Sequence, residues 1–70
     1  MISERINVVI NKRSIQQKDL AAAIDVLPQT FNGYMSGRRE FPVDVVVKVA
    51  KYLNVSADFL LGLSDEVDFD

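Results

Sequence analysis

Two short helical patterns separated by a tight turn, within residues 17–37, constrain this chain more than any other feature. The first places Ala21 and Ile24 on one face, with the periodicity of a short amphipathic helix. The second opens at Pro28, a residue favoured at the first position of a helix, and closes at Gly37, which suits a helix C-terminus. Two helices this close in sequence must cross near the turn, and the small side chain of Ala21 permits a close crossing.

The dipeptide Asn32-Gly33 is a local signal against the second helix, because Asn-Gly favours a two-residue hairpin turn. The residues on either side of it do not alternate between apolar and polar, as hairpin strands would. We therefore expect a helix, in which the glycine costs about 1 kcal/mol relative to alanine.

The 70-residue chain contains neither cysteine nor histidine. Disulfides are therefore excluded, and a structural zinc site would lack its thiolate and imidazole ligands. One small domain without such cross-links must be stabilised by helix packing, with dimer formation as a further source of stability. Histidine is also the commonest general base at neutral pH, and the chain has no glycine-rich phosphate loop. We expect a protein that is not an enzyme and binds no cofactor or metal.

The net charge of −2 by itself argues against a nucleic-acid partner. The charges are unevenly distributed, however, because cations outnumber acids in residues 1–39 and acids outnumber cations in residues 40–70. We interpret the basic half as facing DNA and the acidic half as facing elsewhere. There is no secretory signal pattern and no apolar run long enough to span a bilayer, so we expect a cytoplasmic protein without membrane contact.

Three further helices are expected around the central pair. Ser3 is placed to cap a first helix that ends near Lys12. Pro42 is expected to open a helix of about three turns through the valine-rich residues 43–53, although the valines by propensity also suit a strand. Ser56 is placed to cap the last helix.

The C-terminal part contains more apolar side chains than one short helix can bury in so small a domain. We expect some of Phe59, Leu60, Leu61 and Leu63 to form a dimer contact, the rival interpretation being a packed monomeric core. The acidic residues 64–70 are expected to form a tail or linker after a domain that spans residues 1–63.

Taken together, these pieces resemble the phage-repressor and Cro-type (Xre-like) helix-turn-helix domains. The resemblance covers residues 4–63, and it implies an all-α, compact five-helix bundle whose second and third helices form the helix-turn-helix. It also implies a homodimer that binds an inverted-repeat operator in double-stranded DNA. The matching residues are Gln17-x-x-Leu20-Ala21, Val26, Phe31-Asn32, Gly37-Arg38-Arg39, Pro42, Ala50-x-x-Leu53 and Val55-Ser56-x-Asp58-x-Leu60-x-Gly62.

The resemblance assigns DNA contacts to particular positions. Gln17 would bond a phosphate, Arg38 and Arg39 would touch backbone phosphates, and Lys18 lies next to Gln17 within reach of the backbone. The exposed early positions of the third helix would read base edges. These positions are Pro28, Gln29, Thr30, Asn32 and Gly33.

Three departures from the family pattern stand out. Asp25 replaces the glycine of the turn, and a left-handed conformation there has some cost. Leu27 replaces the polar cap of the third helix and leaves backbone donors for a phosphate or water. Ile10 and Met35 replace a buried ion pair that family members often have, and we expect an apolar contact between them.

The sequence thus predicts a sequence-specific DNA-binding transcriptional regulator that represses by occupying an operator. The alternative is a protein-interaction module, such as an antitoxin or a protein that sequesters another regulator. The overall acidity, the missing cap at Leu27 and the side-chain-free Gly33 favour this alternative.

Overall fold

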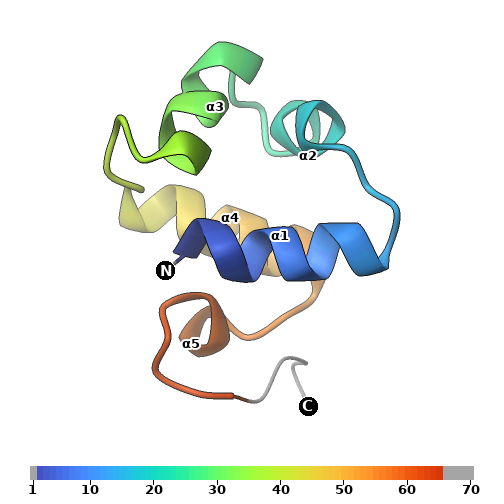
Figure 1. Ribbon diagram of the computed structural model, residues 1–70, viewed down its shortest axis with the longest axis vertical. Coiled ribbons are helices and arrows are strands. Elements are labelled where there is room, and N and C mark those ends of the chain that lie inside the picture. The colour runs from blue at the N-terminus through green and yellow to red at the C-terminus, as the bar shows by residue number, and fades with distance from the viewer. Residues whose placement is uncertain (1, 66–70) are drawn as a thin grey trace.

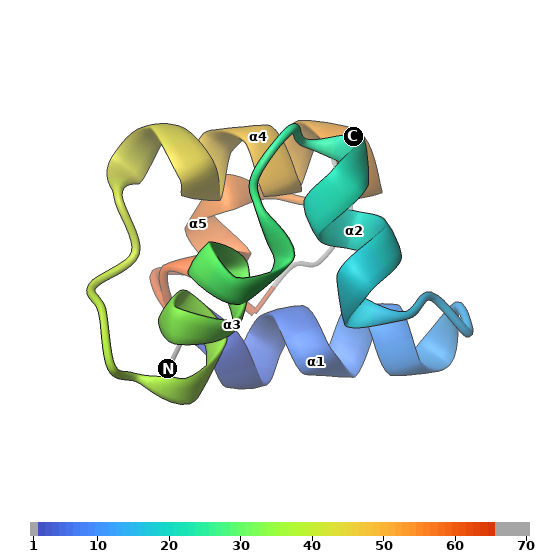
Figure 2. The same cartoon turned by 90° about the horizontal axis from the view of Figure 1, so that it is seen from above.

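The structure is a computed structural model that describes residues 2–65. Regular structure in this range is helical, which confirms the expected all-α fold of five helices. The helices α2 and α3 lie on one side of α1 and α4, and α5 lies on the other (Figures 1 and 2). The helices are α1 (Ile2–Lys12), α2 (Gln17–Ala23), α3 (Pro28–Ser36), α4 (Val43–Leu53) and α5 (Ala57–Leu60).

A single apolar core draws side chains from all five helices, and no polar or charged side chain among the described residues is buried in it. Each large core side chain contributes about 1.5–3 kcal/mol through removal of apolar surface from water. The valine-rich segment forms α4, as the helical interpretation predicted, with one face buried. The buried members are Ile6, Val9, Ile10, Leu20, Ala21, Ile24, Phe31, Val45, Val46, Val49, Ala50, Leu53, Val55, Phe59 and Leu60.

The turn between α2 and α3 depends on one residue in the left-handed conformation. Asp25 has φ 64°, as expected for the residue that replaces the turn glycine. The N–H of the next residue, Val26, then donates to the carbonyl of Ala21 at 2.9 Å. This bond satisfies a carbonyl at the end of the helix, and Val26 packs against the core. The turn is therefore short and fixed, which sets how α3 leaves α2.

The helices α1 and α4 end in the same way, with one residue in the left-handed conformation. Ser14 (φ 57°) and Asn54 (φ 56°) are left-handed, and an apolar residue follows each of them. The next N–H, of Ile15 or Val55, donates to the carbonyl five residues earlier at 2.8 or 3.0 Å. Asparagine is one of the residues that tolerate the left-handed conformation, which suits Asn54 to the position after α4.

The helix starts differ in part from expectation. The first helix begins at Ile2, so Ser3 lies inside it and the predicted Ser3 cap is wrong. The extension is favourable because Ile2 packs against the core. Pro42 is the residue before α4 instead of its first residue. The Ser56 cap is confirmed, since its hydroxyl accepts from the N–H of Phe59 at 3.3 Å.

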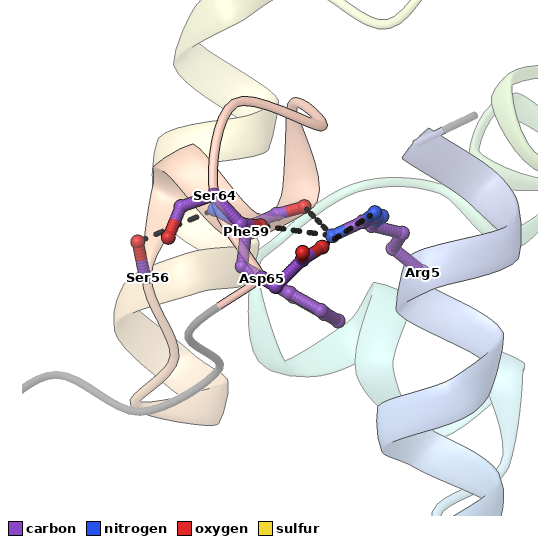
Figure 3. A network of polar contacts seen from close by, with 5 residues as sticks. All are labelled: Arg5, Ser56, Phe59, Ser64 and Asp65. Atoms are coloured by element: carbon purple, nitrogen blue, oxygen red, sulfur yellow. Dashed lines mark hydrogen bonds and ion pairs between the residues drawn. The ribbon is translucent and has the colours of Figure 1, made fainter.

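Arg5 joins α1 to the C-terminal segment, a role that the sequence did not predict (Figure 3). Its Nη1 donates to the carbonyls of Phe59 at 3.1 Å and Ser64 at 3.0 Å. The guanidinium lies 4.6 Å from the centre of the Phe59 ring. Its Nη2 lies 3.5 Å from a carboxylate oxygen of Asp65, whose side chain is fully exposed. The carbonyl bonds are the main stabilising part, because exposed ion pairs contribute little.

The four apolar side chains at the C-terminal end are divided between core and surface. Phe59 and Leu60 are buried, whereas Leu61 is 44% and Leu63 75% exposed. The packed-core interpretation is therefore correct for the first two, and the last two stay available for a contact.

Glu66, Val67, Asp68, Phe69 and Asp70, which belong to the expected tail, lie outside the described residues. Within the described part, no helix combines the length and apolar character required to cross a bilayer.

Candidate nucleic-acid interface

The outer face of α3 is the centre of the candidate interface. Pro28, Gln29 and Asn32 are exposed on it and Thr30 is half-buried, whereas Phe31 is completely buried beneath them. This division arises because Phe31 anchors the opposite face of the helix in the core. The structure therefore holds Gln29 and Asn32 outward on a helix whose position is fixed by packing.

The start of α3 has no side-chain cap, as the sequence predicted. Leu27 occupies the cap position with φ −61° and ψ 140°, its side chain is 65% exposed, and Pro28 follows it as the first helical residue. Helix N-termini carry partial positive charge and free N–H groups that can bind an anion. Because Leu27 offers no polar side chain, a phosphate near Gln29 would meet backbone N–H groups that no cap has bonded.

The start of α2 carries two of the predicted contacts. Gln17 is its first residue and is half-buried, and Lys18 is exposed. Both residues therefore belong to α2, the helix that lies with α3 on the same side of α1 and α4 (Figure 1).

The segment after α3 carries Arg38 and Arg39, and both are exposed. Nη2 of Arg38 donates to Oδ1 of Asn32 at 2.9 Å, across six residues of sequence. The structure therefore brings together two of the predicted site residues, a contact that their positions in the sequence do not indicate.

Gly33 is buried, which corrects its expected exposure on the reading face. The stem of Arg39 covers it, since a Cβ added at Gly33 would lie 3.3 Å from Cδ of Arg39. The N–H of Arg39 donates to the Gly33 carbonyl at 3.1 Å and fixes this arrangement. Gly33 thus lets Arg39 lie close against α3 and offers no side chain of its own.

Aromatic packing holds this segment against the helix. The rings of Tyr34 and Phe41 lie 5.4 Å apart, and each also meets the Phe31 ring edge-on, at 6.5 Å and 6.1 Å respectively. Gly37 reverses the chain between them with φ 88°. Both ends of the segment that bears the two arginines are therefore attached to α3.

Two cations of residues 1–39 bind carbonyls of the protein itself, although the charge distribution predicted that the basic half faces DNA. Arg5 binds carbonyls on the side of α5, and Arg13 donates to the carbonyl of Leu53 at the end of α4. The exposed cations on α2 and on the segment after α3 are Lys18, Arg38 and Arg39, which we call the α3-side cations.

The expected contact between Ile10 and Met35 stays a prediction. Ile10 belongs to the core, and the half-buried Met35 packs against that core.

Comparison with known proteins agrees with this geometry. The Uncharacterized HTH-type transcriptional regulator YobD of Bacillus subtilis (strain 168) is 28% identical to this chain over 68 residues. The matched region covers 97% of this chain and 61% of that relative, so the chain spans less than two thirds of the relative's length. A protein-family model described as Helix-turn-helix matches residues 9–60. Because this match covers most of the chain and the fold has the five expected helices, the chain belongs to the Xre-like helix-turn-helix family.

Proposed function

We propose that this protein is a transcriptional regulator that binds double-stranded DNA sequence-specifically and represses by occupying an inverted-repeat operator as a homodimer. The observation that carries the proposal is the exposed outer face of α3, with Gln29 and Asn32 presented above the buried Phe31. An α-helix fits the major groove of B-DNA, where base edges show distinct donor and acceptor patterns.

Gln29 is the main base-reading candidate. It is exposed in the first turn of α3, and none of the hydrogen bonds found in the described residues uses its side chain. A glutamine amide can pair with the N6 and N7 edge of adenine, a contact worth about 1–3 kcal/mol of discrimination against a wrong base. Thr30 and Pro28, beside it, would contact a thymine methyl or the backbone.

The phosphate contacts are assigned to Gln17 and to the α3-side cations. Gln17 and Lys18 come from α2, whereas Arg38 and Arg39 come from the segment after α3, so the contacts would flank the reading helix on two sides. Such contacts fix orientation and register without reading sequence. Gly33 contributes indirectly, by allowing Arg39 to lie against the helix.

Repression would follow from occupancy alone. A bound dimer excludes other proteins from the operator, and no bond is made or broken. The exposed Leu61 and Leu63 are the candidates for the dimer contact on the side of α5.

Selection of bound fragments from a library of random duplexes, using purified protein, tests this proposal. We expect enrichment of one inverted repeat, and we expect Gln29→Ala to relax the preference at one base pair per half-site. Asn7→Ala is the matched control, because Asn7 is exposed on α1 and outside the proposed interface. If no sequence is enriched while circular dichroism shows the helical fold, the proposal is wrong.

A second candidate function is protein binding, and the exposed apolar side chains favour it. Val43 is 74% and Leu63 75% exposed, and Leu27 stands 65% exposed at the start of α3. Salt dependence separates the two functions, because phosphate contacts release counterions and make the affinity fall steeply with salt.

A further inference from the structure

The contact between Arg38 and Asn32 fixes which way the asparagine amide points. Nη2 of Arg38 lies 2.9 Å from Oδ1 of Asn32. A guanidinium has only donors, and an amide nitrogen has no free acceptor, so the oxygen of Asn32 must face Arg38. The Nδ2 group, with its two donors, is then left for any other partner.

The backbone on both sides of Arg38 is bonded to α3. Before it, Gly37 closes α3 with an N–H bond to the Tyr34 carbonyl at 3.3 Å. After it, the N–H of Arg39 donates to the Gly33 carbonyl at 3.1 Å. The guanidinium is therefore carried beside the outer face of α3, where Asn32 is exposed.

The pairing changes what Asn32 can recognise. A free asparagine reads adenine with two bonds, in which Nδ2 donates to N7 and Oδ1 accepts from N6. With one lone pair of its oxygen accepting from Arg38, the pair presents more donors than acceptors, because the two Nδ2 hydrogens and the remaining guanidinium N–H groups lie side by side. Guanine shows two neighbouring acceptors in the major groove, O6 and N7, whereas adenine shows a donor at N6.

We propose that Arg38 is a positioning residue that turns Oδ1 of Asn32 towards itself and leaves Nδ2 for the base, so that this donor-rich pair selects guanine over adenine at one base pair of each half-site. The inference rests on the proposed function and deepens it, since it assigns the base class read at one position. It also changes the proposed role of Arg38. As a phosphate ligand, Arg38 would raise the affinity for all DNA sequences equally.

The test measures dissociation constants of the full chain for a panel of duplexes. The panel takes the selected operator and places each of the four bases at every position of one half-site. The variants are R38M, R39M, N32A and the double variant R38M/N32A. R39M is the matched control, because Arg38 and Arg39 are both exposed and each variant removes one cation.

We expect the original protein to prefer guanine over adenine by roughly tenfold at the position where N32A removes discrimination. R38M should shift the preference at this position towards adenine, because it removes the guanidinium donors that favour guanine and leaves both lone pairs of Oδ1 free to accept from N6. R39M should lower the affinity for all duplexes and leave the order of bases unchanged. In the N32A background, R38M should no longer change any base preference.

Several results would overturn the inference. If R38M weakens all duplexes by the same factor, Arg38 is a phosphate ligand only. If the original protein prefers adenine at the position that N32A affects, or if N32A affects no position, the pair does not read guanine. A protein that binds every duplex equally refutes the proposed function itself, whereas the other outcomes leave sequence-specific binding intact.

Discussion

Replacing Gly33 by alanine tests how the reading helix and the following segment fit together. The backbone of Gly33 is helical and its φ is not among the positive values, so an alanine can adopt it. Alanine is favoured over glycine inside a helix by about 1 kcal/mol. Against this gain, the new Cβ would lie 3.3 Å from Cδ and 3.4 Å from Cγ of Arg39. The stem of Arg39 must therefore move by a few tenths of an ångström.

The movement should be inexpensive, because Arg39 is exposed and its stem is flexible. We expect Gly33→Ala to stabilise the domain by roughly 0.5–1 kcal/mol, which raises Tm by roughly 2–8 °C for a chain of this size. Thermal unfolding followed by circular dichroism measures this change. The double variant G33A/R39A is the control, since without the arginine stem the gain should approach the full helix-propensity value.

The same substitution should change DNA binding little, because a shift of a few tenths of an ångström in a flexible stem still lets the guanidinium of Arg39 reach the proposed phosphate. Arg39→Ala removes that charge and should weaken binding to all duplexes alike. A lower Tm for G33A that R39A does not restore would refute the packing argument. Unchanged DNA affinity of Arg39→Ala would refute the phosphate role of Arg39.

The remaining predictions concern three other features. Arg5→Met should destabilise the fold by about 2–4 kcal/mol in chemical denaturation, because two carbonyls lose a charged donor, whereas Asp65→Asn should have almost no effect since that carboxylate is exposed. Leu27→Ser should stabilise the domain by about 1 kcal/mol in the same assay, because it supplies the missing cap of α3, and a neutral or harmful effect would contradict the uncapped geometry. The logarithm of the binding constant should fall with the logarithm of salt concentration with a slope of about −2 to −3 per protomer, as the α3-side cations imply, and a slope near zero would exclude the proposed phosphate contacts.

Local signals in the sequence were sufficient to predict the five helices and most of their ends. Pro28, Gly37 and Ser56 each act on the backbone within a few residues, through a fixed φ, a left-handed turn and a cap respectively. Apolar periodicity identified the buried faces for the same reason, because it reflects the geometry of one helix. Ser3 failed as a cap because packing of Ile2 on the core extended the helix past it.

Contacts that depend on tertiary structure were not predicted, neither those that hold the fold together nor those at the candidate site. Arg5 reaches a carbonyl 54 residues away, at Phe59, which requires α5 to be docked against α1. The burial of Gly33 depends on the chain returning over α3 after Gly37. Arginine is also long and amphipathic, so its place in the sequence does not determine whether it solvates a surface or crosses to another helix.

The ratio of two dissociation constants tests the central claim most directly. The purified protein would be titrated against the selected inverted repeat and against a scrambled duplex of equal length, at about 0.15 M salt, where surface charges are screened beyond about 8 Å. The account predicts a ratio of about a thousand or more in favour of the inverted repeat, as specific regulators show. A ratio near one, from protein whose circular dichroism shows the helical fold, would contradict it.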